Sequence, residues 1–185
     1  LIDAIESDLS TDEILQYADE IHESIYDIIA SGRVDTIDTD LLKQLYHGEI
    51  KTVDAYIKQI VDAVNLDETI VVITGDHGEF FGEYGLLGHQ LLARDESTHV
   101  PLVVAGLNAD IDTSSIVQHI DIMKAYFEYN NIQFDQLQGV NLLEEKRDYA
   151  ITEWHAARDL IYDGNEKNIS DAPVKGQAIS IRTEN

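Results

Sequence analysis

Two residues with metal-ligating side chains follow directly after an apolar, β-branched segment. Asp76 and His77 lie within TGDHGE at positions 74–79, behind the segment 69–74. In open α/β sheets, sites form at the carboxyl ends of strands, and flanking glycines let the backbone bend toward an ion. A carboxylate oxygen and an imidazole nitrogen suit Mn²⁺ or Zn²⁺, and Ca²⁺ if further oxygens are supplied. The alternative is a structural turn in which Asp76 caps the next element and His77 is merely exposed.

A glycine-rich segment, GEYGLLGHQ at positions 82–90, comes next. It matches neither a P-loop, which requires Gly-Lys-Ser/Thr, nor a dinucleotide-binding fingerprint. His89 lies on this segment, and its glycines allow His89 to reach back toward Asp76 and His77. The alternative is a solvent-facing histidine on a loop.

The residue types exclude several other mechanisms. The chain has no cysteine, so it contains no thiol nucleophile, disulfide or zinc-thiolate site. No serine lies in a Gly-x-Ser-x-Gly elbow. Asn108, Asp110 and Asp112 resemble the start of an EF-hand loop, but Thr113 and His119 stand where Gly and Glu are needed.

Three helices are predicted to position these residues. Ser10 and Glu13 have the spacing of a capping box, which opens a helix that stops at 31–32 (Ser-Gly). Apolar residues at three-to-four spacing predict a longer helix over 42–64 and an amphipathic helix around 122–127.

The strand pattern indicates an α/β fold with a mainly parallel sheet flanked by helices. The β-branched segment 69–74 is typical of a parallel strand buried on both faces, and we expect the helix over 42–64 to pack on it. A second apolar strand is predicted over 101–105. The order helix, strand, loop, strand, helix is the usual one in α/β folds.

The character of the sequence changes after about residue 140. Segments 149–154 and 177–182 alternate like half-buried strands and are separated by a polar stretch, which predicts an antiparallel pair. We therefore predict two domains: 1–140 as the α/β part and 141–185 as the beginning of a smaller antiparallel subdomain.

The charge is strongly negative, with 36 acidic against 12 basic residues and a formal net charge of −24. Such a surface repels nucleic acids and anionic membranes, so we expect neither as a partner. No apolar run approaches the roughly 20 residues of a membrane span.

Acidic residues spread along the whole chain favour a halophilic source such as a halophilic archaeon, and the cytoplasm over secretion. An ordinary acidic protein is the alternative.

Taken together, these motifs resemble the middle and C-terminal portion of the sulfatase family, in the alkaline-phosphatase-like superfamily. They occur in the order found in that family, and they cover most of the chain. The matching segments are YHGEI (46–50) with VD (53–54), IVDAV (60–64), TIVVITGDHGE (69–79), GEYGLLGH (82–89), DESTHVPLVV (95–104), HIDIM (119–123), QGVNLL (138–143) and YAITE (149–153).

The resemblance implies a site with one divalent ion, commonly Ca²⁺, with Mn²⁺ and Zn²⁺ as alternatives. In the family, two early acidic residues and an Asp followed by Asn or His hold the ion, so Asp76 and His77 correspond to metal ligands. A Lys or His in the glycine-rich loop contacts the sulfate, and His89 takes that place. The chemistry implied is hydrolysis of a sulfate ester of a small molecule or saccharide.

The nucleophile of the family is a formylglycine made in a Cys/Ser-x-Pro-x-Arg motif. Neither Pro101 nor Pro173 has Cys or Ser two places before it. We therefore expect the nucleophile and the two early acidic ligands to lie upstream of Leu1. Because two ligands are too few to close a site, we expect this chain alone to be inactive and to bind metal weakly.

Two other functions remain open. Asp-His-Gly also occurs in relatives that hydrolyse phosphodiesters or phosphonate monoesters with two metal ions. The chain can also belong to a degenerate homologue without catalysis. Neither the sulfate ester nor the oligomeric state follows from these residues.

Overall fold

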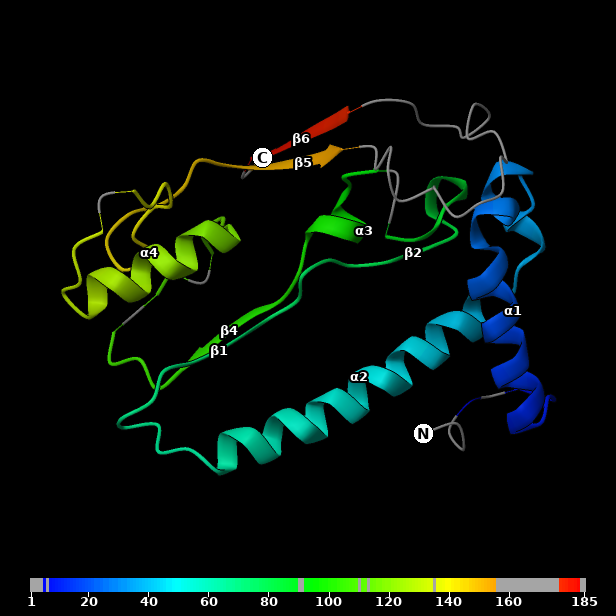
Figure 1. Cartoon of the computed structure of the whole chain (residues 1–185), viewed down its shortest axis with the longest axis horizontal. Coiled ribbons are helices and arrows are strands. Elements are labelled where there is room, and N and C mark those ends of the chain that lie inside the picture. Colours follow the sequence, from blue (N-terminus) through cyan, green and yellow to red (C-terminus); the bar gives the residue numbers. More distant parts are fainter. Residues whose placement is uncertain are drawn as a thin grey trace, which may run out of the picture. The chain divides into compact units, whose positions relative to one another are not determined.

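The computed structural model describes residues 5, 7–89, 92–109, 111–112, 114–134, 136–155 and 177–183 (Figure 1). They form two compact units: the first holds the described residues up to Gly106, and the second holds those from Leu107 on. The elements are α1 (Thr11–Ala30), η2 (Val34–Thr36), α2 (Thr39–Asp62), β1 (Val71–Thr74), β2 (Phe80–Phe81), η3 (Glu83–Gly85), β3 (Leu87–Gly88), α3 (Asp95–Thr98), β4 (Leu102–Ala105), α4 (His119–Tyr129), β5 (Tyr149–His155) and β6 (Gln177–Thr183).

Helix α1 begins and ends where the sequence predicts. The Ser10 hydroxyl accepts a hydrogen bond from the Glu13 backbone N–H at 3.4 Å, and the Glu13 carboxylate accepts one from the Ser10 N–H at 2.8 Å. At the other end Gly32 has φ 66°, and the N–H groups of Gly32 and Arg33 donate to the carbonyls of Ile29 and Ile28. These are the reciprocal capping box and the left-handed glycine stop expected for such a helix.

Helix α2 begins slightly earlier than predicted because Asp38 caps it. The Asp38 side chain accepts a hydrogen bond from the Leu41 N–H at 3.0 Å, which satisfies one of the unpaired donors of the first turn. The predicted apolar stripe is exposed at Ile50, Val53 and Ile60. The described residues therefore do not cover this part of the stripe.

Strands β1 and β4 of the first unit pair antiparallel, with Val72 opposite Val104 and Ile73 opposite Val103 (Figure 1). The described residues do not show the predicted mainly parallel sheet, because every sheet among them is an antiparallel pair of strands. A run of β-branched residues indicates a buried strand but does not determine its direction. A parallel pair of consecutive strands requires a long crossover connection, usually a helix. The only α-helix described between Thr74 and Leu102 is the four-residue α3.

A short hairpin is held against helix α1 by the core of the first unit. Strands β2 and β3 pair antiparallel, with Phe80 opposite Gly88. Phe80 is only 1% exposed. The buried cluster contains residues from α1, the turn after it, and both sides of the hairpin: Ile21, Ile28, Ile29, Val34, Phe80, Leu86 and Leu87. Apolar packing on α1 therefore holds both strands of the hairpin in place.

The second unit contains the antiparallel pair predicted for the end of the chain. Strands β5 and β6 run antiparallel, from Tyr149 opposite Thr183 to His155 opposite Gln177. The polar stretch predicted between them lies outside the described residues. No described helix is long and apolar enough to span a bilayer. The predicted domain boundary after residue 140 stays a prediction.

A buried ion pair joins the start of α4 to later parts of the second unit. Asp121 is 0% exposed. Its carboxylate receives both Nε (2.8 Å) and Nη2 of Arg147, together with the backbone N–H groups of Gln118 (2.8 Å) and Val140 (2.9 Å). Burial opposes ionisation, but these donors outweigh it and keep the pKa of Asp121 below its ordinary value.

Candidate metal and anion site

Asp76 and His77 follow the last residue of β1, as the sequence predicts. The His77 backbone N–H donates to Asp76 Oδ1 at 3.0 Å, and Asp76 Oδ2 lies 3.6 Å from His77 Nε2. Metal-to-ligand bonds measure roughly 2.0–2.6 Å, so two atoms at this separation can bind one ion between them. The Asp76 side chain is 90% exposed, which leaves room for further ligands.

The ring of His77 is oriented by a backbone carbonyl. His77 Nδ1 lies 3.1 Å from the Gly78 oxygen. Because a carbonyl oxygen only accepts, Nδ1 carries the hydrogen, and in the neutral ring the lone pair is on Nε2. This is the arrangement in which histidines usually bind metal ions.

The Asp76 carboxyl is kept ionised by its surroundings. The His77 backbone N–H is the main cause that lowers the pKa of Asp76; the Asp76 N–H and the neighbouring His77 and His89 rings act in the same direction. An ionised carboxylate is the form that binds a metal ion.

Gly78 fixes this turn against helix α3. Its N–H donates to the Ser97 carbonyl at 2.9 Å. A Cβ atom at position 78 would lie 2.1 Å from the Glu96 backbone oxygen, far inside van der Waals contact. Only glycine allows the two backbone segments to approach so closely.

We expect Gly78→Ala to separate the turn from α3 and to lower the thermal unfolding midpoint of the chain by several degrees. Gly75→Ala is the matched control, because a Cβ there meets only ordinary contacts of 3.5 Å or more. Differential scanning calorimetry of both variants checks this. Equal midpoints for the two variants would contradict the close approach at Gly78.

The structure also brings His89 to His77. Their rings stack with centroids 3.8 Å apart and an interplanar angle of 23°. His89 Nδ1 lies 2.9 Å from Glu79 Oε1, and His77 Nδ1 lies 3.9 Å from the same oxygen. The predicted approach of His89 to His77 therefore occurs, and Glu79 is an additional member of the group.

Sequence reasoning assigned no role to Glu79, although a signal for it is present. Phe80 pairs with Gly88 in the hairpin, so Glu79 and His89 are the next residues outward on facing strands. Recognising the apolar segments on both sides of the glycine turn as a hairpin would have placed them together.

The donor atoms present fit a divalent ion. Besides the Asp76–His77 pair, ligand atoms of His77, Glu79 and His89 lie within 4.8 Å of one another. Nitrogen and carboxylate donors together suit Zn²⁺ or Mn²⁺. Ca²⁺ takes six to eight oxygen ligands, so a calcium site here requires further oxygens from other residues or water.

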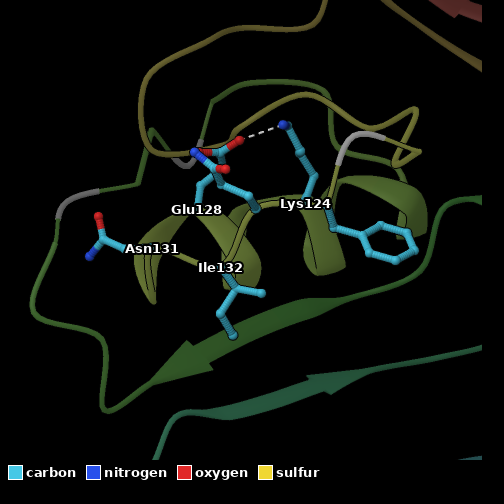
Figure 2. Close-up of a pocket in the computed structure, with 6 residues that line it drawn as sticks. Lys124, Glu128, Asn131 and Ile132 are labelled. Atoms are coloured by element: carbon cyan, nitrogen blue, oxygen red, sulfur yellow. Dashed lines mark hydrogen bonds and ion pairs between the residues drawn. The ribbon is translucent and has the colours of Figure 1, made fainter.

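A pocket lies at the end of α4 in the second unit (Figure 2). An ion pair between Lys124 and Glu128 (2.5 Å) spans one turn of the helix, and Asn131 and Ile132 lie beyond it. None of the predicted site residues lines this pocket.

The candidate ligands Asp76 and His77 lie after the end of strand β1. Comparisons with known proteins identify the family of the chain. Residues 14–132 match the family model of sulfatases. Arylsulfatase K of Bos taurus is 30% identical over 109 residues, which are 55% of this chain and 20% of the relative. The uncharacterized sulfatase YidJ of Escherichia coli (strain K12) is also 30% identical over 109 residues, covering 55% and 22%.

A third relative matches more of the chain. The multifunctional alkaline phosphatase superfamily protein PehA of Trinickia caryophylli is 26% identical over 172 residues, which are 83% of this chain and 33% of the relative. No solved structure gives a significant match.

The chain belongs to the sulfatase family. This family has the alkaline-phosphatase-like α/β fold, and its members generally use a divalent metal ion and a formylglycine. The chain spans about a fifth of the length of arylsulfatase K and YidJ.

Proposed function

We propose that this chain is part of a metal-dependent sulfatase that hydrolyses sulfate esters of small molecules or saccharides. The observation that carries the proposal is the placement of Asp76 Oδ2 and His77 Nε2, 3.6 Å apart and separated from the end of β1 by one residue, Gly75. His89 stacks on the same histidine. A bound ion beside a third polar side chain can bind the negatively charged oxygens of a sulfate group.

In this proposal Asp76 and His77 hold one divalent ion, Ca²⁺ or alternatively Mn²⁺ or Zn²⁺. When bound, such an ion polarises the sulfate oxygens as a Lewis acid. His89 contacts the transferring group and stabilises charge that develops as the ester S–O bond breaks. Residues outside this sequence supply the formylglycine nucleophile and the remaining acidic ligands.

The proposal also includes the activity of the isolated chain, its partners and the salt conditions in which it works. Alone, the chain is inactive and binds Ca²⁺ weakly, since two of the ligands do not close a site. Nucleic acids and membranes are not its partners. A net charge of −24 repels a sulfated substrate unless salt screens it, which fits the cytoplasm of a halophilic organism.

An assay of the full-length protein in molar salt tests the function. We expect hydrolysis of an aryl sulfate that a chelator abolishes and added divalent ion restores. We expect His89→Ala to lower kcat by about 100- to 1,000-fold, the usual effect of removing one group that stabilises transition-state charge. His22→Ala, on the exposed side of α1, is the control and should retain full activity. Activity that survives chelation, or that is unchanged in His89→Ala, would contradict the proposed site.

A further inference from the structure

Glu79 and His89 form a side-chain pair at the open end of the β2–β3 hairpin. Phe80 and Gly88 are the last paired residues of the hairpin, and Glu79 and His89 are the next residue on each strand. Side chains facing each other on antiparallel strands lie within contact distance. The distance of 2.9 Å between Glu79 Oε1 and His89 Nδ1 is that of a good hydrogen bond.

The hairpin holds this pair in a fixed position. Phe80 and Leu87 are 1% and 3% exposed, and both belong to the cluster that packs on α1. Gly88 has φ 75°, and a Cβ atom there would lie 3.1 Å from Ile25 Cδ1 of α1. The residue that follows Glu79 and the two that precede His89 thus pack against the core of the first unit.

The hydrogen bond determines which nitrogen of His89 is available. An ionised carboxylate only accepts, so His89 Nδ1 carries the hydrogen. Within the described part of the chain, Nε2 of His89 makes no hydrogen bond. The ring also stacks on His77 at 3.8 Å, which restricts its rotation further.

We propose that Glu79 is a positioning residue: it holds the ring of His89 through Nδ1, so that Nε2 is the atom that meets the transferring group and donates to it when this nitrogen also carries a hydrogen. The inference rests on the proposed function for the role of His89. It assigns Glu79 an effect on activity that depends entirely on the orientation of His89. Partners of this kind typically change activity by about 10- to 100-fold when removed.

One measurement on the chain itself tests the positioning without any activity. Two-bond ¹H–¹⁵N correlation spectra distinguish the two ring nitrogens of His89. The wild-type chain should show hydrogen on Nδ1, and Glu79→Ala should shift His89 toward the Nε2–H tautomer that is preferred in water. Glu79→Gln should retain part of the Nδ1–H population, since its amide oxygen still accepts. An unchanged tautomer in Glu79→Ala would overturn the proposal.

Kinetics of the full-length protein test whether Glu79 acts through His89. Glu79→Ala should lower kcat by about 10- to 100-fold, with partial recovery in Glu79→Gln. In a His89→Ala background, Glu79→Ala should cause no further loss, because the two residues act as one unit. Glu23→Ala on α1 is the control and should be neutral.

The other outcomes are distinguishable. A further loss of activity and of metal affinity on adding Glu79→Ala to His89→Ala would show that Glu79 is itself a metal ligand, and would overturn the proposal. If the full-length protein does not hydrolyse sulfate esters, the proposed function fails, and the tautomer of His89 still decides whether Glu79 positions it.

Discussion

Replacing Asp76 by alanine is expected to lower kcat/KM of the full-length protein for an aryl sulfate by about 1,000-fold or more. The reason is loss of the ion, whose Lewis-acid contribution is several kcal/mol, and about 4 kcal/mol corresponds to three powers of ten in rate. In the proposed site, Asp76 Oδ2, which lies 3.6 Å from His77 Nε2, is the second of the two ligand atoms. Steady-state kinetics combined with metal analysis of the purified variant checks both effects.

The matched control is Asp54→Ala, which removes an exposed carboxylate from α2 in the same unit. It changes the net charge equally and should leave metal content and activity unchanged. If Asp76→Ala retains the wild-type metal content, then Asp76 does not bind the ion. The group formed by His77, Glu79 and His89 would then be the better account of the metal site.

Replacing Asp121 by alanine is expected to lower the free energy of unfolding of the chain by about 3–5 kcal/mol, the usual cost of removing one partner of a buried ion pair. Asp121 is 0% exposed and accepts hydrogen bonds from Arg147 and two backbone N–H groups, all of which would lose their acceptor. Urea unfolding followed by circular dichroism measures the change. Asp148→Ala, which removes an exposed carboxylate of the same unit, should change it little.

Acid provides an independent check on Asp121. The folded-state pKa of Asp121 lies below that of the unfolded chain, about 3.9 for an ordinary aspartate. Its contribution to stability is therefore fully present above about pH 4 and is lost as the pH falls through the folded-state pKa. The Asp121→Ala chain should lose less stability than wild type over this range. Parallel losses in both chains would mean that Asp121 is not the group responsible.

The helices could be predicted from the sequence because their ends are set by local chemistry. Ser10 and Glu13 lie three residues apart and cap α1 through their own side chains and backbone. The β5–β6 pair could also be predicted, since alternating apolar and polar residues define the two faces of each strand. The direction of β4 relative to β1 could not be predicted, because an apolar run of residues is compatible with either direction.

In the candidate site, contacts between sequence neighbours could be predicted, and contacts that depend on the pairing of strands could not. Asp76 and His77 are neighbours in sequence, so their proximity needs no knowledge of the fold. The approach of His89 to His77 was one of two open alternatives, since flexible glycines permit it without requiring it. Glu79 was missed because its contact with His89 depends on the register of the short hairpin between them.

The measurement that tests the account most directly is the ratio of kcat/KM for an aryl sulfate to that for an aryl phosphodiester, determined with the full-length protein in molar salt. A site with one ion held by Asp76 and His77, and with His89 contacting a sulfate, predicts that the sulfate is the better substrate. A preference for the phosphodiester would contradict the sulfatase assignment and favour a phosphodiester hydrolase with two metal ions.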